Sequence, residues 1–211
     1  MINILKITLL SLIIIFFSAC VKEPLVPKNE TLSIKNGYLY GTIDKVRWES
    51  GADIGIVIRN EFGYEMVIIP SSDDKRFLVK IRPGKYYIFG VAIVSGLTKS
   101  SPKYYPFTLD HLNIIEVKSN EVSYIGDFVF VSQMFKRNGW ARHVFILNKV
   151  KNLYEQANID FQNTFKKSNK MKLVNKYNED INFNLPIGIQ QLCNSLTGCS
   201  DNLMPLKIIN K

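Results

Sequence analysis

The sequence predicts a mainly β protein, in which an antiparallel β-sandwich is followed by one helix and an irregular tail. Two observations predict the sandwich: between residues 31 and 148 short runs alternate apolar and polar positions, and Gly, Pro and Asn turn signals separate these runs. Short, evenly spaced strands with almost no helical period are typical of sandwiches and barrels. After residue 148, apolar residues recur at spacings of three and four, which predicts the helix.

The first twenty residues have the pattern of an export signal. Lys6 gives a positive start, Ile7–Phe17 is an apolar run, and small residues precede Cys20. As a helix the run would span about 16 Å, whereas a hydrocarbon core is about 30 Å thick. We therefore predict a signal peptide over residues 1–19. A buried apolar helix and an uncleaved signal anchor are the alternatives.

The end of this segment, Phe17-Ser18-Ala19-Cys20, resembles the lipobox of bacterial lipoproteins. The resemblance implies that cleavage occurs before Cys20 and that Cys20 then carries acyl chains such as palmitate, so that membrane lipid is a partner. Each buried methylene contributes about 0.8 kcal/mol, so several long chains form a firm anchor. The implied location is the cell membrane. In a Gram-negative cell the lack of Asp after Cys20 implies the outer membrane, facing the periplasm.

The charge of the chain is positive but spread out. The sequence has 27 Lys and Arg residues and 18 Asp and Glu residues, and removal of residues 1–19 takes away only Lys6, leaving 26 − 18 = +8. Outside the cytoplasm such charge favours lipid phosphates or anionic envelope polymers, although codon bias also explains abundant lysine. No nucleic-acid-binding signature is present. We expect an envelope protein or polymer as partner, and no nucleic acid.

Residues 20–30 are expected to be the lipidated cysteine and a tether. Pro24 and Pro27 stand among charged residues and Asn, a composition that does not start a packed element. In an extended, polyproline-like form Val21–Asn29 would reach about 28 Å. The folded domain is expected to begin at residue 31.

The sandwich domain, residues 31–148, is expected to contain two reversals of the chain, the first of them a hairpin. Strands on either side of a turn at Asn60–Gly63 predict the first, and Pro83-Gly84 predicts a second reversal before Tyr86–Val94. Because Tyr86–Val94 is apolar on both sides, we expect a central strand that is covered on both faces. The other expected strands are Gly37–Val46, Tyr104–Leu109, Asn113–Val117, Val122–Val131 and Ala141–Leu147.

The stretch Phe77–Ile88, which holds a strand, the Pro-Gly turn and a tyrosine-bearing strand, resembles prealbumin-like sandwiches such as carboxypeptidase regulatory-like and collagen-binding-protein B-type domains. Val122–Asp127 is similar to a stretch in uncharacterised bacterial lipoproteins with such a sandwich. The resemblance covers about residues 32–147. It implies the fold and an adhesive or accessory role, and it implies no catalytic residues.

Residues 149–169 are expected to form an amphipathic helix packed on the sandwich. Asn148 is placed to cap the start of the helix, and Lys166 and Lys167 suit its negative C-terminal end. Either the chain's own sheet or a partner protein must cover the apolar stripe of the helix. The stripe consists of Val150, Leu153, Tyr154, Ala157, Phe161 and Phe165.

The tail, residues 170–211, is expected to be irregular because Pro and Gly recur in it, with one short helix near Ile187–Ser195. Cys193 and Cys199 are close in sequence, and Gly198 eases a turn between them. In an exported chain this predicts a disulfide. Their spacing is too long for a Cys-x-x-Cys site and no His lies nearby, so we expect neither a metal nor a cofactor.

Few residues suggest chemistry. His111 follows Asp110, and His143 follows Arg142. A base paired with an acid is the starting material of general acid–base catalysis, but neither His lies in a recognisable nucleophile motif. Tyr104, Tyr105 and Phe107 are a candidate aromatic platform for a sugar or peptide, and an ordinary edge strand is the alternative. We predict no catalytic residue.

The sequence therefore favours a non-enzymatic, membrane-anchored envelope lipoprotein whose sandwich binds or scaffolds another envelope component. One alternative is a hydrolase, or an accessory domain of one, that uses His111 or His143. Another is a carrier of a small ligand at the open end of the sandwich, which only the aromatic content suggests.

Overall fold

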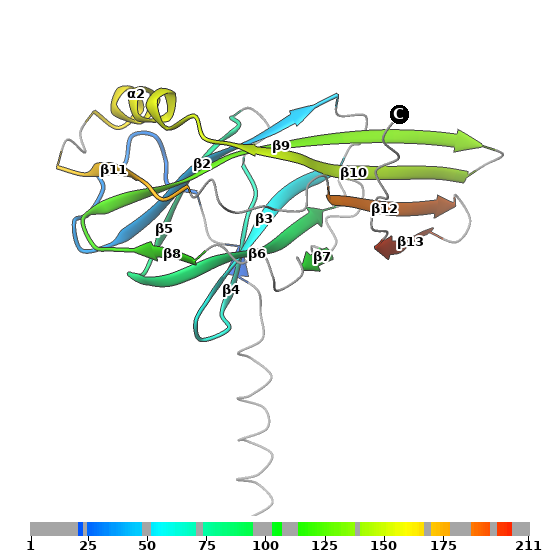
Figure 1. The fold of residues 1–211 in the computed structure, drawn as a ribbon, viewed down its shortest axis with the longest axis horizontal. Coiled ribbons are helices and arrows are strands. Elements are labelled where there is room, and N and C mark those ends of the chain that lie inside the picture. Colours follow the sequence, from blue (N-terminus) through cyan, green and yellow to red (C-terminus); the bar gives the residue numbers. More distant parts are fainter. Residues whose placement is uncertain are drawn as a thin grey trace, which may run out of the picture.

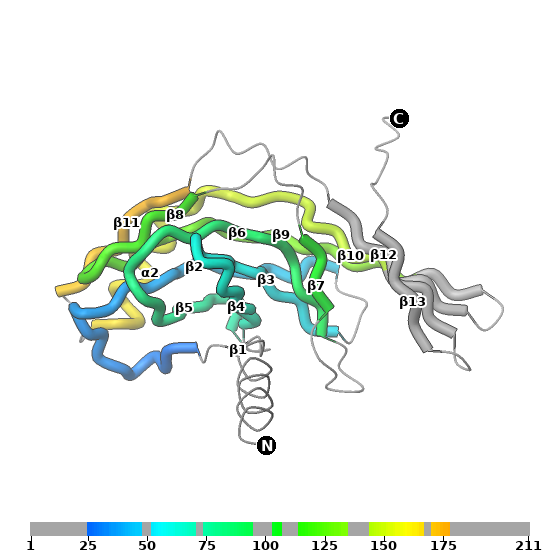
Figure 2. The backbone as a smooth tube through the Cα atoms, turned by 90° about the horizontal axis from the view of Figure 1, so that it is seen from below, coloured from blue at the N-terminus to red at the C-terminus, as the bar shows by residue number. Residues whose placement is uncertain are grey.

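A computed structural model describes residues 21–22, 25–47, 52–70, 74–94, 103–106, 114–137, 140–166, 170–177, 187–194 and 198–203. The fold is mainly β, as predicted, with two sheets packed as in a sandwich and one helix in the described part, α2 (Figure 1). Seen from below, β3, β4 and β6 of the first sheet lie in front of β2 and β9 of the second (Figure 2). The predicted signal peptide, Cys20, Phe107 and His111 lie outside the described residues.

The first sheet has six strands and is organised around β6. This strand pairs antiparallel with β3 on one side and with β7 and β8 on the other, which confirms the expected central position of Tyr86–Val94. The hairpin of β3 and β4 around Asn60–Gly63 is also confirmed. The strands are β1 (Val21–Lys22), β3 (Asp53–Asn60), β4 (Glu65–Ile68), β6 (Gly84–Val94), β7 (Lys103–Pro106) and β8 (Ile114–Val117).

The second sheet has seven strands and is organised around the long strand β9. This strand pairs antiparallel with β10 and parallel with β2 and β11. Strand β2 continues the sheet to β5, and β10 continues it to β12 and β13. The strands are β2 (Gly37–Val46), β5 (Arg76–Ile81), β9 (Glu121–Arg137), β10 (Trp140–Lys151), β11 (Lys172–Asn175), β12 (Ile187–Asn194) and β13 (Gly198–Leu203).

The main core lies between the two sheets. It forms because alternate residues of each strand point inward, and these positions hold aliphatic or aromatic side chains. The largest fully buried side chains of this core include Phe77, Phe128, Phe130, Phe145, Ile43, Ile54, Ile56 and Ile58.

The helix α2 (Tyr154–Thr164) covers the outer face of the second sheet (Figure 1). It is shorter than predicted, because β10 continues to Lys151 and Val150 pairs with Phe128 of β9. Asn148 does not cap the helix; it is the extra residue at a register shift in β10, and the residue before the helix is Leu153. Within the described residues, no helix has the length and apolar character needed to cross a membrane.

The predicted short helix at Ile187–Ser195 is wrong. Residues Ile187–Asn194 form β12, which pairs along β10, and β13 pairs with β12 in turn. The tail is therefore less irregular than expected. The free edge of β10 offers a row of backbone donors and acceptors, and pairing with that edge outweighs the weak local preference of the segment.

The segment before residue 31 is packed against the domain, whereas its composition suggested a free tether. Leu25 forms a β-bridge with Val79, and the Val26 N–H donates to the Leu78 carbonyl at 2.8 Å. Upstream, β1 pairs in parallel with Met66 and Val67 of β4. Edge strands of both sheets thus offer backbone hydrogen-bond partners to this segment. The Pro and charged residues of the segment give no sign of such partners.

Candidate functional site

A β-bulge in β9 shapes the outer face of the second sheet. Tyr40 of β2 pairs with Tyr124 and Thr42 pairs with Asp127, so β9 holds one residue more than β2 between these pairs. Gly126 lies in the bulge with φ +114°, a conformation that side-chain-bearing residues rarely adopt. The bulge shifts the alternation of side chains along the rest of the strand.

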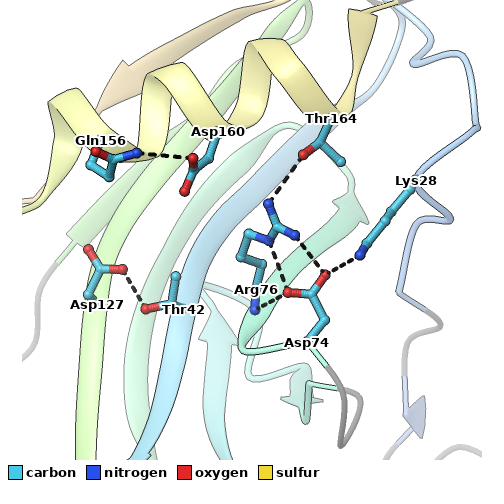
Figure 3. A network of polar contacts seen from close by, with 8 residues as sticks. All are labelled: Lys28, Thr42, Asp74, Arg76, Asp127, Gln156, Asp160 and Thr164. Carbon is cyan, nitrogen blue, oxygen red and sulfur yellow. Dashed lines mark hydrogen bonds and ion pairs between the residues drawn. The ribbon is translucent and has the colours of Figure 1, made fainter.

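This shift keeps the apolar side chains inward and turns a carboxylate outward. Ile125 before the bulge and Phe128 after it both belong to the core between the sheets, although a regular strand would place them on opposite faces. Tyr124 belongs to the cluster beneath α2, and Asp127 lies on the same side, beside the helix (Figure 3). The bulge therefore determines the direction in which Asp127 points.

Asp127 is only 6% exposed, and two hydroxyl groups hold it. The Thr42 hydroxyl donates to one carboxylate oxygen and the Tyr124 hydroxyl donates to the other. The Tyr124 oxygen also accepts the N–H of Leu153 at 2.8 Å, at the start of α2. A buried carboxylate needs such donors to offset the loss of water. The contacts therefore join β2, β9 and the first turn of the helix.

An ion cluster holds the other end of the helix (Figure 3). Asp74 accepts from Arg76 Nε at 2.9 Å and forms an ion pair with Lys28 Nζ at 2.8 Å. Arg76 Nη1 donates to the Thr164 hydroxyl, at the C-terminal end of α2, at 3.3 Å. A cation suits this negative end of the helix. The cluster thus connects the N-terminal segment, β5 and α2.

The pKa values of Asp74, Tyr40 and Tyr124 suit groups that keep fixed hydrogen-bond partners better than groups that transfer protons. Burial raises the pKa of Asp74, but hydrogen bonds from Arg76 and Lys28 outweigh that effect and lower it to about 2. Burial raises the pKa of Tyr40 to about 12. Burial, and then the hydrogen bond with Asp127, raises the pKa of Tyr124 well above its usual range. At neutral pH, Asp74 is an anion and both tyrosines are protonated.

The open surface near these clusters is grooved. A depression of about 400 Å³ lies beside the Asp127 contacts, between α2 and strands β2 and β5. A larger groove of about 840 Å³ lies at the end of the sandwich, between the N-terminal segment, the β3–β4 hairpin and the β5–β6 turn. The larger groove is lined by Leu25, Val26, Pro27, Glu30, Asn36, Asn60, Tyr64, Met66, Lys80, Ile81, Arg82 and Tyr86.

The predicted aromatic platform is not formed as expected. Tyr105 is 6% exposed and packs in the core between the sheets, and Tyr104 is half-buried against the outer apolar cluster of the first sheet. A buried ring cannot offer its face to a sugar or peptide. The alternation of β7 sends these two side chains to opposite faces, so they do not share one surface. Phe107 lies outside the described residues.

The other predicted residues are placed only in part. His143 lies in β10, in register with Met134 of β9 and Gln191 of β12. Cys193 of β12 lies directly opposite Cys199 of β13. In the part of the chain that the structure describes, no group of three or more His, Cys, Asp and Glu residues is arranged to hold a metal ion.

No protein-family model matches the sequence, and a comparison with curated proteins gives no match. Sequence reasoning missed Thr42, Arg76 and Lys28, because the contacts of Thr42 with Asp127, of Lys28 with Asp74 and of Arg76 with Thr164 join residues far apart along the chain. The available signal was Gly126 next to Asp127 within an apolar strand, since a glycine inside a strand often marks a bulge.

Proposed function

We propose that this chain is a lipid-anchored envelope protein, without catalytic activity, whose prealbumin-like sandwich binds or scaffolds another envelope component. The observation that carries the proposal is the packing of the N-terminal segment. Val21–Lys22 pair with β4, and Leu25 and Val26 contact β5. The residue that the lipobox-like pattern marks for acylation, Cys20, therefore directly precedes a segment paired with the domain. Acyl chains on Cys20 would hold the domain close to the bilayer surface.

The polar clusters support a scaffolding role. Asp127 and Tyr124 fix the start of α2, while Asp74 and Arg76 fix its end and, through Lys28, the N-terminal segment. Groups engaged in this way hold elements in place rather than present reactive atoms. The groove at the end of the sandwich carries the exposed cations Lys80 and Arg82, which suit an anionic envelope polymer or protein.

Metabolic labelling with a palmitate analogue tests the anchor. Cys20→Ser should abolish the label and leave an unprocessed precursor, because only a thiol at this position receives the lipid and permits cleavage. Cys193→Ser is the matched control and should be labelled and processed like the wild type. Label that persists in Cys20→Ser, or a mature wild-type protein without label, would contradict the anchor.

We also propose the disulfide between Cys193 and Cys199. Residues directly opposite in an antiparallel pair have Cα atoms about 4.5–5.5 Å apart, within the range of about 4.4–6.8 Å for disulfides, and the register of β12 and β13 supports this pairing. The closed loop is short, so the bond should stabilise the tail by about 2 kcal/mol. Alkylation of the exported protein before and after reduction tests it. Two free thiols without reduction would refute the bond.

A small-ligand carrier is the second candidate, and the groove of about 840 Å³ favours it because this volume suits a small molecule. Native mass spectrometry of the purified protein would detect a bound compound. A carrier should show a discrete added mass that Tyr86→Ala in the groove removes, whereas a scaffold should show none. The hydrolase alternative with His111 or His143 stays an untested prediction.

A further inference from the structure

The tip of the β3–β4 hairpin exposes two aromatic side chains. Phe62 is 87% exposed and Tyr64 is 44% exposed. The Asn60 side-chain oxygen accepts the N–H groups of Phe62 at 3.0 Å and Tyr64 at 2.8 Å, and Gly63 completes the turn with φ +83°. These contacts fix the backbone of the turn. Binding through the two aromatic side chains would therefore cost little further backbone entropy. Exposed aromatic residues that lie close together in this way are typical of surfaces that bind a partner or a membrane.

The direction of the chain places this tip beside the expected lipid. Strand β1 runs parallel to β4 and begins opposite Met66, so the chain enters β1 from the end of β4 that holds the turn. Cys20 is bonded to Val21, which fixes their Cα atoms about 3.8 Å apart. Phe62 is four residues before Met66, so these two residues are at most about 14 Å apart. The acylation position and the aromatic tip therefore lie at the same end of the hairpin.

The charges around the tip suit lipid headgroups. Lys80 and Arg82 line the groove next to Tyr64 and are exposed. The Glu61 N–H donates to the Lys85 carbonyl at 3.3 Å, which places the exposed Lys85 in the strand next to the tip. Three acids oppose these three cations: Glu61 at the turn itself, Glu30 in the same groove, and Glu116, which lies opposite Lys85 in β8. Aromatic side chains with nearby cations are the combination found where proteins meet the bilayer interface.

We propose that the β3–β4 hairpin tip, Phe62 and Tyr64, inserts into the membrane that holds the acyl chains of Cys20, as a second contact that orients the domain. This proposal rests on the proposed acylation. The occupant is the lipid bilayer, because the acylated residue would fix the bilayer at this end of the domain. In Figure 1 the hairpin projects from the side of the molecule opposite α2, so the helix face would point away from the membrane.

Tryptophan fluorescence of the full-length protein, purified from membranes and reconstituted, tests the proposal. Phe62→Trp is compared with its parent in phosphatidylethanolamine–phosphatidylglycerol vesicles with and without brominated acyl chains, which quench tryptophan at short range. The parent contains Trp48 and Trp140, and its emission is subtracted. Ile159→Trp is the matched control, because Ile159 is 54% exposed and lies on α2. Palmitate-analogue labelling and vesicle flotation are recorded for every sample.

These results apply to protein that carries the palmitate label and floats with the vesicles. We then expect brominated lipid to quench most of the emission added by Trp at position 62 and to leave the emission added by Trp at position 159 unchanged. Equal, weak quenching at both positions in such a protein would overturn the hairpin contact and leave the anchor intact; a tip that serves a partner protein would give this result. A protein without label would overturn the anchor and the hairpin proposal together.

Discussion

The two faces of the second sheet are buried in different ways. The inner face meets the first sheet through aliphatic and aromatic side chains, and no charged residue of the described chain belongs to that core. The outer face meets α2 through aromatic residues, several of them tyrosines, and the buried carboxylate of Asp127. A second sheet offers a large apolar area, whereas one helix of 11 residues offers little.

The outer layer, between α2 and the second sheet, therefore depends on specific contact geometry. The rings of Tyr40 and Phe161 meet edge to face, with centroids 5.6 Å apart, and Tyr154 donates its hydroxyl to the Leu173 carbonyl at 2.7 Å. Polar contacts fix orientation more strictly than apolar contacts of equal area. We infer that the inner core supplies most of the stability and that the outer layer fixes the position of the helix.

Loss of a large buried ring should give the greatest effect, and more so in the inner core. Phe128 is fully buried between the sheets and Phe161 is 2% exposed beneath the helix. Phe128→Ala should lower the free energy of unfolding by about 4–5 kcal/mol and Phe161→Ala by about 3, because a single helix can settle into part of the cavity. Urea denaturation of both variants measures this. An unchanged midpoint for Phe161→Ala would show that α2 is not part of the folded core.

The bulge should be the next most sensitive feature. A Cβ at Gly126 would lie 2.8 Å from Val150 Cγ1 and 3.0 Å from Tyr177 Cδ2, in a backbone conformation that already disfavours side chains. Gly126→Ala should cost about 2–4 kcal/mol. Gly63→Ala is the control, because φ is also positive there but no atom lies within 4 Å, and it should cost about 1 kcal/mol. Equal urea midpoints for the two variants would show that the packing around the bulge does not constrain residue 126.

The Asp127 contacts should have a smaller, coupled effect. Tyr124→Phe leaves one carboxylate oxygen and the Leu153 N–H without the hydroxyl and should cost about 1–3 kcal/mol. Thr42→Val removes the other donor to Asp127. Measured by urea denaturation, the double variant should differ from the sum of the single variants, because both hydroxyls share one carboxylate. Strict additivity would mean that the two hydroxyls do not act together.

Acid should weaken the ion cluster slightly. The pKa of Asp74 is lowered from 3.8 to about 2, so the cluster stabilises the fold fully above about pH 4 and loses this contribution as the pH falls toward 2. After allowance for solvent screening the effect is about 1 kcal/mol. Asp74→Asn should therefore lower the urea midpoint at pH 7, and the gap to wild type should narrow below pH 4. A gap independent of pH would show that the carboxylate charge is not the cause.

Much of the first sheet could be predicted from the sequence. The turn at Asn60–Gly63 and the apolar run Tyr86–Val94 are local signals, and local signals identify hairpins and buried strands. The helix was predicted for the right region but began too early. Val150 fits the helical stripe by spacing, yet it pairs with Phe128 because β9 extends alongside it.

The remaining features depend on contacts that sequence spacing does not reveal. Parallel pairing of β2 with β9 joins residues more than 80 positions apart, as in the Thr42–Asp127 contact. The strand at Ile187–Asn194 forms against β10, and the burial of Tyr105 follows from the alternation of β7. The hairpin tip was predicted as a turn, but the exposure of Phe62 and the pairing of β1 with β4 appear only in the fold.

The proposed membrane attachment depends most on acylation of Cys20, and mass spectrometry of the mature N-terminus tests this acylation most directly. Trypsin should release Cys20-Val21-Lys22 from the membrane-extracted protein. We predict that this peptide is the N-terminus and that its mass includes a diacylglyceryl group on the cysteine. A chain that still begins at Met1, or an N-terminal Cys20 with an unmodified thiol, would contradict the anchor and the orientation inferred from it.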